Sequence, residues 1–445
     1  MKERLLSEAS KALNELMKEF NDVAIKLTSR DAVMVKLWNS EPSVVQSWRE
    51  HTAVIYLSKD KRVFELGINL SKIEDVIKVA KRVKDYVGMM KESELYAPLP
   101  EPSRSGIDDV LVDSTVIKYM EDPLEPTNVM IEEAFREGAE RVAGTLHLEV
   151  SKYALVTSKG FEGYKEGSEV MAYLRAFKGE DSGHWAYGSR YLRIEELKRV
   201  GKLAGRYASE CSGKVTDIEP GRYDVVLSPL VLGNLMSYVG MMASALYVMM
   251  GFSIFMRRKP GEKIASEVLT LIDKPKDTEL AGSAEFDDEG IETFDKEIIG
   301  KGIFKNLLHN SKTAGKLGVK STGNAGWVMP RPWNLEVVKG DYGLDELIKE
   351  VKKGLLITNN WYTRLQNYVE GSFSSVTRDA LFLVENGELR ARVRRVRISD
   401  TFPNLLSNVQ ALGKDQYLIK WWEVEVPSRL PYALVRNVGI TKPFA

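Results

Sequence analysis

VVLSPLVLGNLMSYVGMMASALYVMMGFSIFM, residues 225–256, is an uncharged run that lies between Asp224 and Arg257. It is longer than the roughly 20 apolar residues that a membrane-spanning helix needs. However, glycine, serine and asparagine interrupt it, and no other stretch of the sequence resembles a span. The pattern indicates a short strand closed by Pro229 and then a helix at residues 230–250. We therefore predict a buried helix and no membrane span.

Composition limits the class of protein. A chain of 445 residues is too long to fold around one hydrophobic core of ordinary size, so we expect two domains, residues 1–215 and 216–445. The formal net charge is zero, so no overall field attracts nucleic acid or acidic membranes. The single Cys211 excludes an internal disulfide and fits the reducing cytoplasm. Residues 1–20 contain scattered acids and no apolar core, so they predict an amphipathic helix and not a signal peptide.

Hydrophobic periodicity predicts an α+β fold. The first domain contains two rounds of strands followed by helices, which predicts a layered arrangement of sheet and helix. The second domain is strand-rich around the buried central helix, and Asn386-Gly387 marks a hairpin turn in it. The expected elements of the first domain are strands at 23–27, 32–39, 52–58 and 62–70, a helix at 127–142, strands at 145–157 and 170–177, and a helix at 194–208.

Known catalytic motifs are missing from the sequence. It contains no His-Glu-x-x-His, no Gly-x-Ser-x-Gly and no phosphate-binding loop. His184, His309 and Cys211 are expected to be ordinary residues without catalytic roles. The acidic residues 285–289 could bind a divalent cation, but a solvated turn with Gly290 at positive φ is favoured. The arginines at 390, 392 and 394 alternate with Leu389, Ala391 and Val393, which predicts a solvated strand face and makes nucleic-acid binding unlikely.

Several blocks of the sequence resemble the TldD/PmbA family, also called modulators of DNA gyrase. The most specific are residues 287–326 and 371–414, and the likeness extends over roughly the whole chain. The blocks, in order, are "ALVTSKGFEGYKEGSEVMAYLRA" (154–176), "AEFDDEGIETFDKEIIGKGIFKNLLHNSKTA" (284–314), "STGNAGWVMPRPWNLEV" (321–337), "VKKGLLITN" (351–359), "GSFSSVTRDALFLVENGEL" (371–389) and "LLSNVQALGKD" (405–415).

This resemblance implies a place for a metal. One subunit type in the family carries His-Glu-x-x-x-His on a helix early in its C-terminal domain, and a later cysteine completes its zinc site. In register on Gly240, Met236 and Met241 stand at the two histidine positions and Ser237 at the glutamate position. No cysteine follows Cys211. The chain therefore resembles the zinc-less, TldE/PmbA-like branch, with no catalytic or metal-binding residue and no cofactor of its own.

The resemblance implies a non-catalytic subunit of a heterodimeric metallopeptidase that degrades unfolded peptides. Zinc is then expected in the partner, a zinc-bearing TldD-like paralogue, and this chain is expected to be inactive in proteolysis without that partner. The alternatives are an independent metallopeptidase that uses His184, His309 and residues 285–289, a DNA gyrase or nucleic-acid modulator, and a membrane-anchored protein. The residues expected to line a peptide cleft are Ser321, Thr322, Gly323, Asn324, Ala325, Gly326, Trp327, Pro332 and Asn334, unless the glycines only form tight turns.

Overall fold

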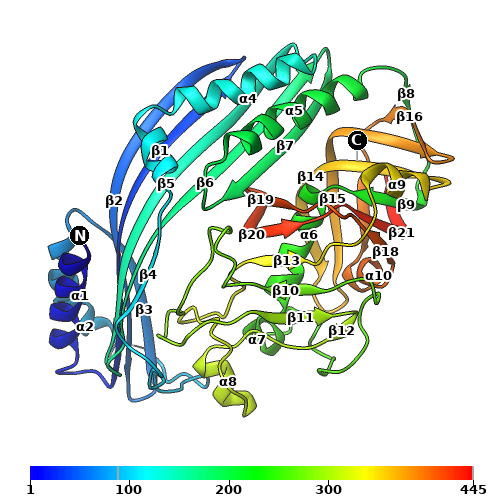
Figure 1. Cartoon of the computed structure of the whole chain (residues 1–445). Coiled ribbons are helices and arrows are strands. Elements are labelled where there is room, and N and C mark those ends of the chain that lie inside the picture. The colour runs from blue at the N-terminus through cyan, green and yellow to red at the C-terminus, as the bar shows by residue number, and fades with distance from the viewer. Residues whose placement is uncertain (88–89, 443–445) are drawn as a thin grey trace.

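The computed structural model describes residues 1–87 and 90–442 and contains three β-sheets with helices packed on them (Figure 1). The first sheet has the strand order β3-β2-β1-β5-β6-β4, and β7 pairs with β6. Neighbouring strands are antiparallel apart from β4 and β6, which are parallel. Its strands are β1 (Asp22–Trp38), β2 (Glu41–Lys59), β3 (Arg62–Leu70), β4 (Ile107–Leu111), β5 (Arg141–Thr157), β6 (Glu162–Lys178) and β7 (Asp181–Ser189).

Two groups of helices cover parts of this sheet, as Figure 1 shows, one near the N-terminus and one at the opposite end. α1 packs on β1 and β5 through the fully buried Leu5, Ala9 and Leu16. α5 packs so closely on β7 that a Cβ on Gly183 would lie 2.2 Å from the carbonyl oxygen of Ala204. The helices are α1 (Lys2–Leu16), the 3₁₀ turn η1 (Ile73–Asp75), α2 (Val76–Val87), α3 (Ser114–Glu121), α4 (Leu124–Arg136) and α5 (Ile194–Cys211).

The second half of the chain forms the other two sheets, and the first sheet curves around them (Figure 1). One sheet has the order β12-β11-β10-β13-β20-β19. The other has the order β14-β9-β21-β17-β15-β16-β8, and β14 also pairs with β15, so five of its strands form a closed cycle. The strands are β8 (Val215–Thr216), β9 (Gly221–Leu227), β10 (Leu271–Asp273), β11 (Lys296–Gly300), β12 (Ile303–Phe304), β13 (Leu335–Val337), β14 (Lys353–Asn367), β15 (Ser372–Glu385), β16 (Glu388–Val393), β17 (Arg397–Thr401), β18 (Val409–Leu412), β19 (Tyr417–Trp421), β20 (Val424–Leu430) and β21 (Ala433–Thr441).

The α+β fold class is confirmed, but the central helix is shorter than predicted. α6 ends at Met242, and a separate short helix follows after Ser244. The break occurs because the backbone pairs with Leu308, whose N–H donates to the Ala243 carbonyl and whose carbonyl accepts from the Ala245 N–H. The helices of this half are α6 (Pro229–Met242), α7 (Ala245–Met249), α8 (Ser311–Leu317), α9 (Leu344–Lys349) and α10 (Phe402–Ser407).

Of the other local predictions, some are confirmed and some need different bounds. The two expected strands at 23–27 and 32–39 are one continuous strand, β1, and the helix expected at 127–142 is α4, which ends at Arg136. The Asn386-Gly387 hairpin is confirmed, with φ values of 52° and 77°. Strand pairing changes from the first sheet to the others near residue 215, but one hydrophobic cluster contains buried residues from both halves. The domain boundary at that residue therefore stays a prediction.

The apolar run at 225–256 has no helix that could cross a bilayer. Within residues 1–87 and 90–442, no helix is both long and apolar enough to span a membrane. Instead α6 packs against β14 and β20, between the two C-terminal sheets, and 11 of its residues are buried. The prediction of a buried central helix is thus confirmed.

Candidate functional site

The helix α6 places the four positions of the degenerate motif in different environments. Ser228 caps the helix, because its Oγ accepts from the Val231 N–H at 3.3 Å. Met236 is completely buried, whereas Ser237 and Met241 are half-buried. The Ser237 hydroxyl donates to the Gly233 carbonyl oxygen at 2.8 Å, so it is used within the helix. Ser237 and Met241 border the groove described below, and Met241 also borders the larger cavity.

Gly240 lets α6 approach the neighbouring sheet closely. A Cβ on Gly240 would lie 2.8 Å from Cδ1 and 3.2 Å from Cδ2 of Leu335, a fully buried residue of β13. Gly233, about two helical turns earlier, is similarly close to Leu430 of β20. The small residues thus serve helix-to-sheet packing, as the sequence suggests.

The donor set at these positions does not fit zinc. Zinc prefers imidazole, thiolate and carboxylate ligands, whereas Met236 and Met241 offer neutral thioethers and Ser237 a hydroxyl. Across residues 1–87 and 90–442, no group of three or more His, Cys, Asp or Glu side chains lies together as a possible metal site.

A groove runs along the exposed side of α6. It encloses about 420 Å³ and is lined by aromatic and apolar side chains together with Glu423 and Glu425. Trp422 is 61% exposed, so a large apolar surface faces solvent here. Such a surface is typical of sites that bind extended or apolar partners. Its aromatic and methionine members are Tyr238, Met241, Met242, Tyr247, Phe252, Tyr368 and Trp422.

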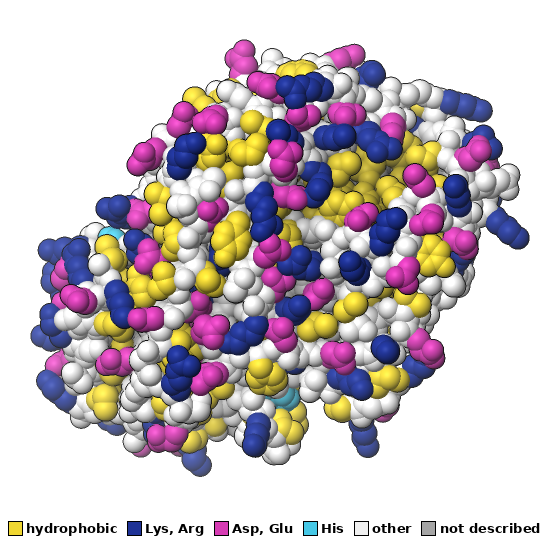
Figure 2. All heavy atoms as spheres, in the orientation of Figure 1, with side chains coloured by type: hydrophobic (Ala, Val, Ile, Leu, Met, Phe, Trp, Pro, Cys, Tyr) yellow, Lys and Arg dark blue, Asp and Glu magenta, His cyan; other side chains and the backbone are white. Residues whose placement is uncertain are grey.

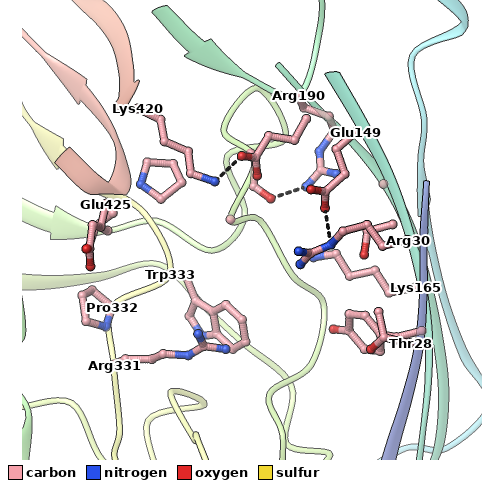
Figure 3. A pocket seen from close by; sticks show the side chains of 18 of the residues that line it. Thr28, Arg30, Glu149, Lys165, Arg190, Arg331, Pro332, Trp333, Lys420 and Glu425 are labelled. Carbon is pink, nitrogen blue, oxygen red and sulfur yellow. Dashed lines mark hydrogen bonds and ion pairs between the residues drawn. The ribbon is translucent and has the colours of Figure 1, made fainter. Parts of the chain in front are cut away.

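A larger cavity of about 530 Å³ adjoins this groove. The two share the lining residues Met241, Glu425 and Val426, so they lie side by side near the C-terminal part of α6. The cavity lies between strands β1, β5 and β6 of the first sheet and, from the second half, α6, β19, β20 and loop residues. Figure 3 shows Glu425 and Lys420 on one side of it and Thr28 and Lys165 on the other.

Basic side chains dominate the lining of this cavity. Six basic side chains and three acidic ones line it. Arg30 Nε lies 2.9 Å from Glu149 Oε1, and Lys420 pairs with Glu169, as the dashed lines in Figure 3 mark. The basic residues are Lys26, Arg30, Lys165, Arg190, Arg331 and Lys420, and the acidic ones are Glu149, Glu169 and Glu425.

The segment 321–327, expected to line a peptide cleft, forms a closely bonded turn. The side chain of Thr322 accepts from the His309 N–H at 2.7 Å, and Ser321 donates to the His309 carbonyl. Gly323 has φ +67°, and a Cβ there would lie 2.7 Å from the Glu292 carbonyl oxygen. This glycine serves a tight turn, which was the alternative interpretation of the sequence.

The remaining residues of this segment bond mainly inward. Asn324 donates to Asp273 Oδ2 at 2.6 Å, and the Ala325 N–H donates to Asp287 Oδ2 at 3.0 Å. The Gly326 carbonyl accepts from Asn310, and the Trp327 indole N–H donates to the Asp288 carbonyl. Asn324 and Ala325 are fully buried and already have these partners within the chain.

The following segment reaches the cavity. Pro332 lines it, next to Arg331 and Trp333, whereas Asn334 is fully buried and donates to the Lys274 carbonyl at 2.9 Å. Figure 3 shows the Arg331 side chain extended along the Trp333 ring, whose centre lies 5.4 Å from the guanidinium carbon. Of the nine predicted cleft residues only Pro332 lines the cavity, and a peptide-binding role for the nine stays a prediction.

The acidic turn at residues 285–289 was predicted to be solvated, and this prediction is wrong. Gly290 has the expected positive φ of 80°, but Asp287 and Glu289 are buried. Glu289 accepts from the Ser311 N–H at 2.8 Å and lies 3.5 Å from Lys312 Nζ. The prediction failed because these partners come from α8, more than 20 residues later in the chain. The turn joins segments of the second half and does not form a cation site with three acidic ligands among the described residues.

His184 and His309 lie in separate places. His184 is on β7, buried against Trp421, with ring centres 4.5 Å apart. Burial lowers the pKa of His184 to about 4, and that of His309 also to about 4. His309 Nδ1 lies 3.2 Å from Thr313 Oγ1. The independent-metallopeptidase alternative needs these residues to converge with 285–289, and they form no such cluster within the described residues.

The basic residues of the cavity were not predicted from the sequence. Lys165 lies on β6, Arg190 directly follows β7, and Arg331 lies in a loop of the second half, so no spacing pattern links them. Cys211 is buried, and its thiol has a pKa raised to about 11, which agrees with an unreactive thiol. On the face drawn in Figure 2, basic and acidic side chains alternate without a large area of one sign.

The known proteins to which this chain is similar point to one family. The model for the PmbA/TldA metallopeptidase C-terminal domain matches residues 220–442, half of the chain. A metalloprotease of Methanothermobacter thermautotrophicus is 28% identical over 279 residues, 60% of each chain. A metalloprotease of Methanocaldococcus jannaschii is 32% identical over 201 residues, 44% of each chain. The matched part thus spans 60% or less of the length of these curated relatives.

The fold also resembles a solved structure. The crystal structure of TldE from Thermococcus kodakarensis superposes with a TM-score of 0.84 and covers 98% of this chain and 100% of that one. The sequence identity is 19%, so the likeness concerns the fold alone.

Proposed function

The chain belongs to the PmbA/TldD metallopeptidase family, and we propose that it is a non-catalytic subunit of a heterodimeric member of that family. In this proposal a zinc-bearing paralogue supplies the metal and the activated water, and this chain closes one side of the chamber that holds an unfolded peptide. The chain itself holds no zinc and cleaves no bond alone.

One observation carries the proposal: the residues at the expected metal positions cannot do the chemistry. A zinc peptidase needs ligands that hold the ion and a general base that accepts a proton from its bound water. Met236 is buried in the core, and the Ser237 hydroxyl is bonded within α6. Neither Met241 nor these two can act as that base.

The groove and cavity around Met241 support a role in holding substrate. Catalysis gains from confining the peptide next to the activated water, and a subunit without ligands can contribute to that confinement. The groove offers aromatic side chains and a flexible methionine, which adapt to varied peptide side chains. The mixed charge pattern in Figure 2 gives no comparable support to the gyrase or nucleic-acid alternative.

Mixing this chain with the zinc-bearing paralogue tests the proposal. The purified chain is analysed for bound zinc and assayed with an unfolded peptide, alone and with the zinc-bearing paralogue. We expect less than stoichiometric zinc, no cleavage by either chain alone, and cleavage by the mixture that a chelator abolishes. Stoichiometric zinc in this chain, or full activity of the paralogue by itself, would refute the proposed role.

A further inference from the structure

The larger cavity has one strongly basic end, formed by Lys26, Lys165, Arg190 and Arg331. These side chains act on common neighbours: the positive charges of Lys26, Arg331 and Lys165 all lower the pKa of the Asp288 carboxyl. Arg190 and Lys26 in turn lower the pKa of Lys165. The four cations therefore lie in one electrostatic cluster, which we call the basic end.

Two carboxylates face these four cations. Lys26 Nζ lies 2.8 Å from Asp288 Oδ1, and Arg331 lies 3.8 Å from the other oxygen of the same group. Lys165 Nζ lies 3.5 Å from Asp109 Oδ2. The four cations thus have two carboxylates as direct neighbours, and Lys26 and Arg331 share one of them, Asp288.

Arg190 is buried and shares its carboxylates with other cations. Its Nη2 donates to the Ala281 carbonyl at 3.2 Å and to the Ser283 hydroxyl at 2.5 Å, whereas its Nε has no hydrogen-bond partner among the described residues. The nearby negative charges are those of Asp109 and Glu169, which pair with Lys165 and Lys420. A buried guanidinium is costly unless anions lie near it, so a further anion is favoured here.

The cavity, at about 530 Å³, has room for such an anion. A Cβ on Gly167 would lie 2.2 Å from Arg190 Nη1, so the glycine lets the guanidinium lie directly against β6 at the cavity lining. Burial lowers the pKa of Lys165 to about 8, and its ammonium donates to the Ser283 carbonyl next to Asp109. Arg331 is half-exposed at the rim and is held in place by Trp333.

We propose that the basic end binds the free C-terminal carboxylate of a peptide, whose body lies along the aromatic groove. This inference rests on the proposed peptide-holding role. The neighbouring groove argues for a chain terminus: the cavity and the groove share Met241, Glu425 and Val426, so a peptide that lies in the groove ends next to the cavity. Every peptide carries this carboxylate, so recognition of it needs no particular sequence.

Charge at the opposite end favours the same orientation. Glu423 and Glu425 border the groove, and the pKa of Glu423 is raised by burial and by Glu425, so a second negative charge there is unfavourable. An acidic group of the ligand is therefore repelled from the groove and attracted to the basic end.

The test measures binding by the isolated chain with calorimetry. The probes are an N-acetylated alanine- and serine-rich hexapeptide with a free C-terminal carboxylate, the same peptide as its C-terminal amide, and inorganic phosphate. We expect the acid to bind about tenfold or more tightly than the amide, which is the factor that one charge-assisted hydrogen bond supplies. Arg331→Gln should remove most of this preference, and Arg331→Lys should retain part of it.

Arg206→Gln is the matched control. Arg206 is a similarly exposed arginine that pairs with Glu210 on α5 at 2.6 Å, outside the cavity lining. It should leave the preference for the acid unchanged. Equal binding of acid and amide overturns the carboxylate site but leaves the proposed peptide-holding role standing. Binding of phosphate without binding of either peptide overturns both, because the cavity would then be a site for small anions.

Discussion

Gly240→Leu tests whether α6 is a packed core helix. The new Cβ would lie 2.8 Å from Cδ1, 3.2 Å from Cδ2 and 3.5 Å from Cγ of Leu335, and the leucine would bring three further carbons beyond it. Leu335 is fully buried on β13 between β10 and β20, so it has little space into which it could move. Overpacking of this kind costs about 1–3 kcal/mol.

Helix propensity opposes part of that cost. Replacing glycine within a helix gains up to about 1 kcal/mol. Because the Cβ already lies 2.8 Å from Leu335, we expect the overpacking cost at the upper end of its range, which leaves a net loss of about 2 kcal/mol in the free energy of unfolding. Gly315→Leu isolates the gain. Gly315 is exposed on α8, and a Cβ there would meet only Ala97, at 3.8 Å. This control should unfold at the same urea concentration as the wild type or at a higher one.

Urea unfolding followed by tryptophan fluorescence measures both variants, and a double variant tests the contact directly. Truncating the neighbour in Gly240→Leu/Leu335→Ala should recover at least part of the loss, giving a favourable coupling between the two sites. The packing argument is refuted if Gly240→Leu is as stable as the wild type. It is also refuted if Gly315→Leu is destabilised equally, because the effect would then not depend on the contact with Leu335.

Two further predictions concern buried charge. Lys312→Met should lower the free energy of unfolding by about 3 kcal/mol, because it leaves the buried Glu289 without its ammonium partner, whereas Lys316→Met on the exposed side of the same helix should have little effect in urea unfolding. His184 has a folded-state pKa of about 4, below its ordinary value of 6.5, so the unfolded chain binds more protons between these values. The stability that this neutral histidine contributes is complete above pH 6.5 and is lost as pH falls toward 4, by about 3 kcal/mol. Unfolding of the wild type and of His184→Gln across this range should show a smaller loss in the variant, and equal losses would contradict the assignment.

The sequence predicts those structural features that depend on residues close to one another along the chain. The periodicity of β3, the hairpin at Asn386-Gly387 and the burial of α6 all follow from patterns within a few residues. The break after Met242 does not, because the strand-like pairing partner Leu308 lies more than 60 residues later. Local periodicity contains no information about such a contact.

The same reason explains the errors at the candidate site. Acidic residues around a glycine usually indicate a solvated turn, but Glu289 is buried by partners on α8. The basic end combines Lys165 of β6 and Arg190, which follows β7, with Arg331 of a loop far away in the sequence. A weak signal was available for Arg190, which directly follows the small residues Gly188 and Ser189 at the end of a strand, where a long charged side chain needs a specific partner.

Met241→His alone should not create a zinc site. Met241 borders both the groove and the cavity, so an imidazole there is accessible to the metal. A single imidazole binds zinc weakly, and the other position aligned with a histidine, Met236, lies in the core, where a histidine would replace apolar packing with a polar group. The hydroxyl of Ser237 does not supply the carboxylate that a general base needs. Zinc binding and cleavage would therefore need several coupled changes in α6. Zinc analysis after dialysis against excess metal should find the single variant indistinguishable from the wild type, and stoichiometric zinc in it would show that further ligands lie within reach of Met241.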